Sequence, residues 1–155
     1  MKVYTDTSVI GGCFDEEFKE WSNGLFLEFV AGTKQIMLSD LTLQELAFAR
    51  QEVREKINEV STFYIIGIAI NDEAIELAET YIKEGALTNK SYNDALHIAL
   101  ATLNNSDVLA SWNFKHIVNL ERIRLYNSIN LRLGYRFIEI RTPREILNIE
   151  KNGKD

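Results

Sequence analysis

The sequence has little of what cross-links a fold or anchors a protein in a membrane: it contains one cysteine and no long apolar run in 155 residues. Because Cys13 has no second cysteine to pair with, no internal disulfide can form. The longest apolar stretch, from Phe63 to Ile70, is far shorter than the roughly 20 residues that a membrane-spanning helix requires. No apolar signal segment follows Met1. We therefore expect a cytoplasmic protein that has no membrane role.

Sequence typical of linkers is also scarce. Pro143 is the only proline, and no Gly/Ser-rich stretch divides the chain. A chain of this length can bury roughly 68–70% of its unfolded surface without disulfides. We predict a single domain over residues 1–147 and a polar C-terminal tail over residues 148–155.

Charge is unevenly distributed along the chain. Residues 1–111 carry a net charge of −10 and residues 112–155 a net charge of +4, which gives −6 overall. This balance argues against a protein that coats nucleic acid nonspecifically. The basic segment has two interpretations, solvated helix faces or a flank that guides phosphates towards an acidic pocket. The residues of such a flank are Lys115, Arg122, Arg124, Arg132, Arg136, Arg141 and Arg144.

The periodicity of apolar residues predicts alternating strands and helices. We expect strands at 2–5, 36–38, 63–66, 108–110 and 137–140. Helical spacing marks 21–30, 42–60, 74–82, 91–103 and 120–129, and Gly32 and Gly85 follow two of these segments as stops. This alternation predicts an α/β fold, a three-layer α/β/α sandwich with a mostly parallel five-stranded sheet. In such a sheet, sites lie at the carboxyl ends of the strands where their order reverses.

Three acids are expected at that end of the sheet. Asp6 follows the first strand, Glu45 lies in the first turn of the helix after the second strand, and Asp94 lies in the first turn of the helix that starts at Ser91. Carboxylates are hard oxygen ligands that suit Mg²⁺ or Mn²⁺. Three clustered carboxylates would repel one another without a cation. The pattern therefore predicts a metal site suited to phosphodiester chemistry.

Helix capping is the alternative explanation for each acid. Thr42–Glu45 and Ser91–Asp94 both resemble capping boxes with the acid at the third helical position. Asp6 is followed by Thr7 and Ser8, so it could cap the next turn in the same way. Taken singly, each acid is compatible with either role, and their joint placement favours the metal site.

Four segments in order resemble the successive motifs of the PIN-domain nucleases. They are Val3–Ile10, Leu43–Leu46, Asn93–Ala99 and Leu109–Ile117, and Thr142–Glu145 resembles a C-terminal ending found in toxin-like members. The resemblance spans nearly the whole chain. It implies a metal-dependent ribonuclease, often the VapC-type toxin of a toxin–antitoxin pair.

The resemblance also implies roles for individual residues and partners. Asp6, Glu45 and Asp94 would hold Mg²⁺ or Mn²⁺, and RNA would be the substrate. Asn113 stands where many members have a fourth acid, so a second metal would be held weakly. A toxin-like member would be expected to form a homodimer and to be blocked by a cognate antitoxin protein.

The remaining polar residues have two interpretations each. Ser111 is either an ordinary residue at a strand end or a hydroxyl that contacts water or phosphate. His97 lies three residues after Asp94, and it either reaches the pocket or is fixed by a hydrogen bond in the core. Lys115 and His116 are expected as surface contacts to phosphate, and a catalytic base is the alternative interpretation of His116. Two histidines and one cysteine, widely separated, argue against a zinc site.

Competing activities lack their motifs. A haloacid-dehalogenase-like phosphatase would need a second aspartate two residues after Asp6, where Ser8 stands. No P-loop, dinucleotide fingerprint or Gly-x-Ser-x-Gly elbow is present. The serious alternative is a catalytically weak PIN-like module that binds RNA or a protein, with Asn113 as the mark of lost activity.

Overall fold

The computed structural model describes residues 1–152, with side chains described to Asn148. A five-stranded sheet forms its middle layer, in the order β3-β2-β1-β4-β5, with every neighbouring pair parallel. The strands are β1 (Lys2–Thr5), β2 (Gln35–Ser39), β3 (Ile65–Ile68), β4 (Val108–Ala110) and β5 (Ile140–Arg141). The order reverses between β1 and β4, because the chain runs outward from β1 to β3 and then returns to the other side of β1.

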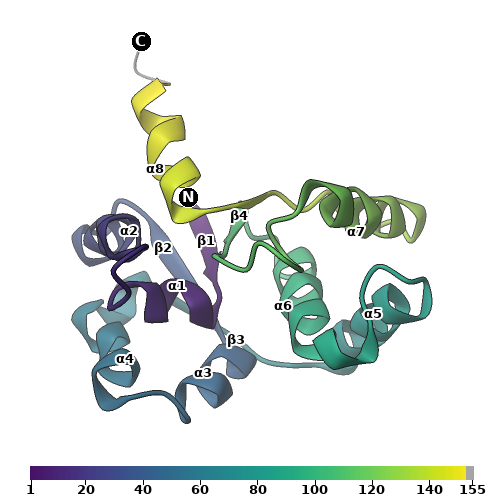
Figure 1. Cartoon of the computed structure of the whole chain (residues 1–155), viewed down its shortest axis with the longest axis horizontal. Helices are drawn as coiled ribbons and strands as arrows, with labels where there is room; N and C mark the ends of the chain where they lie inside the picture. The colour runs from purple at the N-terminus through teal and green to yellow at the C-terminus, as the bar shows by residue number, and fades with distance from the viewer. Residues whose placement is uncertain (153–155) are drawn as a thin grey trace.

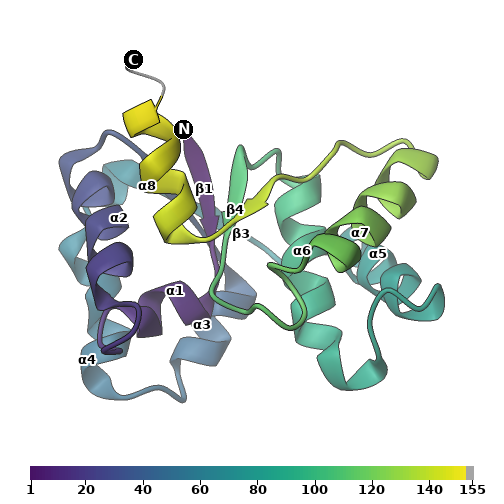
Figure 2. The ribbon, with the colours of Figure 1, turned by 45° about the horizontal axis from the view of Figure 1, so that its top comes forward.

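Helices cover both faces of this sheet, as Figures 1 and 2 show. The helices are α1 (Thr7–Gly12), α2 (Lys19–Ala31), α3 (Asp40–Leu46), α4 (Gln51–Glu55), α5 (Asp72–Lys83), α6 (Tyr92–Leu103), α7 (Leu120–Arg132) and α8 (Pro143–Asn152). Three short 3-10 helices cover Lys56–Glu59, Thr62–Tyr64 and Asn89–Ser91. Helices α1, α2 and α4 lie on one side, and α5, α6 and α7 lie on the other. The α/β/α sandwich predicted from the sequence is confirmed.

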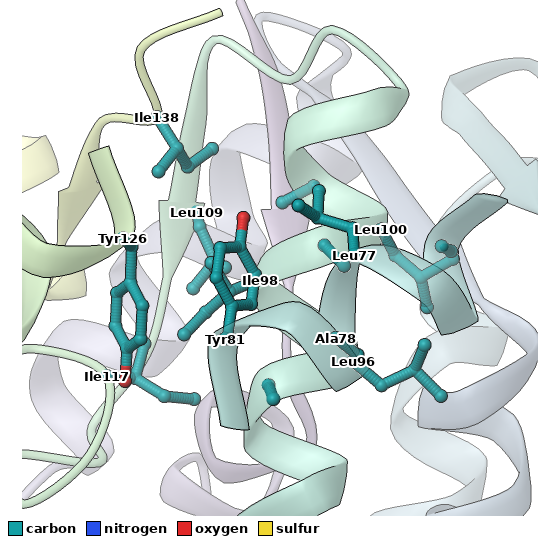
Figure 3. Packing of buried hydrophobic residues seen from close by; sticks show 14 of the residues in the cluster. Leu77, Ala78, Tyr81, Leu96, Ile98, Leu100, Leu109, Ile117, Tyr126 and Ile138 are labelled. Atoms are coloured by element: carbon teal, nitrogen blue, oxygen red, sulfur yellow. The ribbon is translucent and has the colours of Figure 1, made fainter. Parts of the chain in front are cut away.

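The two faces of the sheet bury separate clusters, because successive strand residues point to opposite faces. Val3 packs with Phe26 and Phe29 of α2. Tyr4, the next residue, packs with α5 and α6 on the opposite face. Figure 3 shows part of this second cluster, in which Tyr81 of α5 lies near Tyr126 of α7, with ring centroids 5.3 Å apart.

The long helix predicted over 42–60 is wrong. Helix α3 begins at Asp40, because the Ser39 side chain caps it by accepting a hydrogen bond from the Thr42 N–H, and it ends at Leu46. A second helix starts only at Gln51. Leu46, Val53 and Val60 are all buried at intervals of seven residues, so the apolar spacing continues through the break and imitates one helix.

Two predicted strands are shifted or shortened. β3 begins two residues late, because Ser61 caps the short 3-10 helix over Thr62–Tyr64. β5 is confined to Ile140–Arg141, because the Asn127 side chain bonds both the N–H and the carbonyl of Ile138. These backbone groups are therefore satisfied without a neighbouring strand.

The C-terminal helix α8 crosses the predicted domain boundary at residue 147 and continues to Asn152. Residues 153–155 of the predicted tail lie outside the described residues. Over the described part of the chain, no helix has the length and apolar content needed to span a membrane.

Candidate active site at the carboxyl ends of β1 and β4

Asp6 lies at the carboxyl end of β1, directly beside the point where the strand order reverses. Its Oδ1 accepts hydrogen bonds from Ser8 Oγ at 2.6 Å and from the Val9 N–H at 3.2 Å, so it does cap α1. Its Oδ2 accepts from Ser111 Oγ at 2.6 Å. The side chain is buried, and burial raises its pKa although His97 and these hydrogen bonds oppose the rise. The capping role and the proposed role as a ligand therefore fall on one buried carboxylate.

Glu45 reaches the same region from α3. It is the sixth residue of that helix and not a member of its first turn, and the capping box predicted at Thr42–Glu45 is wrong because Ser39 is the cap. Glu45 Oε1 accepts from Thr7 Oγ1 at 2.8 Å and lies 2.6 Å from His97 Nε2. Burial raises the pKa of Glu45, but His97 and Thr7 outweigh burial, so this pKa lies below its ordinary value. Glu45 is thus fixed as a carboxylate.

His97 connects Glu45 to the core. Because a carboxylate only accepts hydrogen bonds, Nε2 of His97 donates to Glu45. Its Nδ1 lies 2.7 Å from the hydroxyl of Tyr4, which in turn donates to Ser39 Oγ at 2.8 Å. The ring is only 3% exposed. Both interpretations drawn from the sequence hold, since His97 is fixed in the core and also contacts an acid of the pocket.

Asp94 lies in the first turn of α6, as predicted, but it contacts the loop after β4. Its Oδ1 accepts from Asn113 Nδ2 at 3.2 Å, and its Oδ2 lies 3.0 Å from His116 Nδ1. The Ser91 side chain makes no capping hydrogen bond, so the capping box predicted there does not form. His116 is partly buried against Asp94 and is not a simple surface group.

Hydrogen bonds join two of the three acids through the segment after β4. Ser111 donates to Asp6 and accepts from the Asn113 N–H at 3.0 Å, and Asn113 donates to Asp94. Ser111 is fully buried, so its hydroxyl serves Asp6 in this structure. This connection is the main geometric support for one site that contains both Asp6 and Asp94.

Lys115 lies apart from this network. With Arg122 and Asn119 it lines an open cavity of about 430 Å³. Arg122 also donates to the carbonyl of Ala86 at 2.7 Å, which holds its guanidinium at the cavity. Arg132 is instead paired with Glu84. The basic flank predicted from the sequence therefore contains fewer cations that could contact phosphate, because Arg132 already pairs with an acid.

The donor chemistry of the site suits a hard cation, because its ligands are carboxylate oxygens. Each of the three carboxylates already accepts hydrogen bonds from neighbouring side chains. Among residues 1–152, no three histidines, cysteines or acids are grouped closely enough to hold a metal ion. A cation would therefore have to compete with the present hydrogen bonds for these oxygens.

Three contributors were missed from the sequence. Thr7 and Ser8 hold Glu45 and Asp6, and their position directly after Asp6 was a usable signal. Tyr4 holds His97, but a tyrosine inside a buried strand carries no sequence sign of that role. Asp107 accepts from the Lys2 N–H at the opposite end of the sheet and takes no part in the site.

Comparison with known proteins rests on structure. No family model and no curated protein matches the sequence. VapBC-1 from nontypeable Haemophilus influenzae matches with a TM-score of 0.56 and 18% identity, over 93% of this chain and 99% of that one. The chain has the fold of the VapC toxins.

Two further solved structures share this fold. VapC20 of Mycobacterium tuberculosis, described as a sarcin–ricin loop cleaving toxin, has a TM-score of 0.56 and 15% identity over 74% of this chain and 92% of that one. FitAcB from Neisseria gonorrhoeae matches with a TM-score of 0.56 and 12% identity over 91% and 97%. The fold implied by the PIN-domain resemblance is therefore confirmed.

Proposed function

We propose that this protein is a Mg²⁺- or Mn²⁺-dependent endoribonuclease that acts as the toxin of a type II toxin–antitoxin pair. The observation that carries this proposal is the hydrogen-bonded line from Asp6 through Ser111 and Asn113 to Asp94. It lies where the strand order reverses, which is the usual place for sites in parallel sheets. The shared fold with toxins, one of which is described as cleaving the sarcin–ricin loop, supports the same assignment.

In this proposal Asp6, Glu45 and Asp94 would hold the metal after exchanging some of their present hydrogen bonds for it, because the three are not grouped closely enough to hold a metal ion as they stand. A bound divalent ion would acidify a water and neutralise charge on the phosphate. The chain contributes the orientation of the ligands: Ser111 fixes Asp6, and His97 fixes Glu45. Neighbours of this kind set ligand geometry and commonly change metal affinity by about 10–100-fold when removed.

The substrate would approach over the loop after β4. Lys115 is exposed and lines the cavity beside His116, which suits a contact to a backbone phosphate. A toxin–antitoxin complex from Klebsiella pneumoniae contains a chain of the same fold, with a TM-score of 0.55 and 19% identity. We therefore include a small antitoxin and a second copy of this chain among the proposed partners.

One observation favours the alternative, a catalytically weak module that binds RNA or protein. Both ends of the Asn113 amide are occupied, since Nδ2 donates to Asp94 and Oδ1 accepts from the His116 N–H at 3.0 Å. Its carbonyl oxygen would have to share or lose this hydrogen bond in order to act as a fourth ligand. The two functions differ in whether RNA is cut.

Cleavage of a labelled RNA pool tests the proposal. Purified protein is incubated with Mg²⁺, Mn²⁺ or EDTA, alongside the Asp94→Asn variant prepared identically. We expect metal-dependent cleavage that falls by at least about 100-fold in the variant, because loss of a ligand removes charge stabilisation worth several kcal/mol. Absence of cleavage with either metal, while both proteins are folded, would establish the binding module instead.

A further inference from the structure

An aromatic cleft lies beside the carboxylates, and no part of the proposed cleavage uses it. It has a volume of about 360 Å³ and is lined by Glu17, Phe18, Trp21, Trp112, Phe114, Thr142, Arg144 and Glu145. We propose that this cleft binds one nucleobase of single-stranded RNA adjacent to the phosphate that is cut. The inference rests on the proposed function for its choice of RNA as the ligand.

Two rings form a fixed base for the cleft. Phe18 and Trp112 are stacked, with centroids 4.3 Å apart and planes 18° from parallel. Trp112 Nε1 donates to Ser22 Oγ at 2.8 Å, and the indole is only 8% exposed. These contacts hold the two rings in place, so an incoming base would not have to order them.

Phe114 supplies the accessible surface. Its centroid lies 6.2 Å from those of both Phe18 and Trp112, and its side chain is 51% exposed. An aromatic ring supported below and open above is the feature on which bases of single strands stack. Every base has a π-face, so this contact would tolerate different sequences.

Hydrogen bonds of neighbouring residues link the cleft to the carboxylates. The Trp112 N–H donates to Ser8 Oγ, which donates to Asp6. Asn113, which precedes Phe114, donates to Asp94. Trp112 and Phe114 thus flank the residue that contacts Asp94, so RNA bound at the acids would pass beside the residues of this cleft.

Arg144 supplies positive charge at the cleft, whose lining also includes the carboxylates of Glu17 and Glu145. The exposed guanidinium of Arg144 lies over the Trp21 ring, 5.1 Å from its centroid. A cation beside aromatic rings matches the phosphate and base of one nucleotide, which is how single-strand grooves are built. An aromatic side chain of a protein partner is the competing occupant, but it would use neither Arg144 nor the adjacent acids.

The test measures binding of short RNAs in which each nucleotide in turn lacks its base. All proteins carry Asp94→Asn so that the RNA stays uncut, and Mg²⁺ is present. We compare Phe114→Ala and Phe114→Tyr with Phe63→Ala, a matched control because Phe63 is 88% exposed and lies before β3, at the opposite edge of the sheet. Kd is obtained from the fluorescence of the labelled RNA.

We expect one abasic position to weaken binding about 5- to 150-fold, the range for stacking one base. Phe114→Ala should weaken binding of intact RNA by a similar factor and abolish the effect of that abasic position, whereas Phe114→Tyr and Phe63→Ala should behave like the parent. No RNA binding, or an abasic effect that persists in Phe114→Ala, overturns the base site. Cleavage by the parent chain with unchanged Phe114→Ala binding would remove the base site and leave the nuclease intact. Base-dependent binding that Phe114→Ala abolishes, without cleavage by the parent chain, would support the base site and overturn the nuclease.

Discussion

At the residue scale, Asp6 combines burial with negative charge. Burial raises its pKa although Ser8, Ser111 and His97 favour the carboxylate. When the pKa of an acid is higher in the folded state than in the unfolded one, folding takes up protons. Stability therefore falls as the pH rises from the ordinary aspartate value, about 3.9, through the raised one.

Replacement of Asp6 by Asn should therefore stabilise the metal-free protein at neutral pH by about 0.5–2 kcal/mol, a common gain when a strained functional group is removed. Asn is an equally good helix cap. Urea denaturation in EDTA measures this change. Mn²⁺ at about 100 times its Kd should stabilise the parent by about 2.7 kcal/mol and leave Asp6→Asn unaffected; equal stabilisation of both would argue against Asp6 as a ligand.

His97 acts on Glu45 and not on RNA. The His97→Phe variant should weaken Mn²⁺ binding by about 10–100-fold, because Glu45 loses the group that orients it. It should also lower the free energy of unfolding by about 1–3 kcal/mol, since the Tyr4 hydroxyl and Glu45 lose a partner. Calorimetric titration and urea denaturation check the two values.

Tyr4→Phe is the matched control for His97. It removes the hydroxyl on the far side of the imidazole but leaves the 2.6 Å contact between His97 and Glu45. We expect a smaller loss of Mn²⁺ affinity than in His97→Phe. Unchanged affinity in His97→Phe itself would reduce His97 to a core residue.

At the element scale, α1 connects the acids to the aromatic cleft through close packing. A Cβ at Gly12 would lie 2.6 Å from Ser22 Oγ and 2.8 Å from Trp112 Nε1. These two atoms are already hydrogen-bonded to each other. The helix therefore approaches the indole as closely as a glycine allows.

Gly12→Ala should destabilise the protein by about 1–3 kcal/mol, the usual cost of overpacking a core. Gly11→Ala is the control in the same helix, where a new Cβ meets nothing within 4 Å. That change should stabilise by about 0.5–1 kcal/mol, because alanine loses less backbone entropy. Urea denaturation of both variants provides the comparison, and equal effects would contradict the close packing.

At the scale of the whole molecule, a chain of net negative charge presents two cations at one cavity. The net charge is −6, yet Lys115 and Arg122 line an open cavity of about 430 Å³ together with Glu121. Arg132, by contrast, is paired with Glu84. When RNA binds, only the side-chain cations that contact its phosphates should displace counterions from the RNA.

The salt dependence of RNA binding distinguishes these cations. Lys115→Gln should reduce the slope of log K against log salt concentration by about 0.7, the value for one phosphate contact of a single strand. Arg132→Gln should leave the slope unchanged. Binding titrations at several salt concentrations, with Asp94→Asn present in each protein, measure both slopes; equal slopes would show that Lys115 does not contact phosphate.

The sequence by itself determined the layered α/β fold, because alternating apolar spacing records which faces are buried. It also placed Asp6 directly after the first strand and Asp94 in the first turn of α6. It misplaced the start of α3, which Ser39 caps. It also joined α3 to α4, since Leu46, Val53 and Val60 keep a helical spacing across the break that ends at the non-helical backbone of Arg50.

Only the tertiary structure decided what each acid contacts. Ser111 meets Asp6 across 105 residues of sequence, and His97 meets Glu45 across 52. Such contacts depend on sheet order and on the directions of side chains, which periodicity does not encode. The aromatic cleft arises for the same reason, because Phe18 and Trp112 come from distant segments that pack at one end of the sheet.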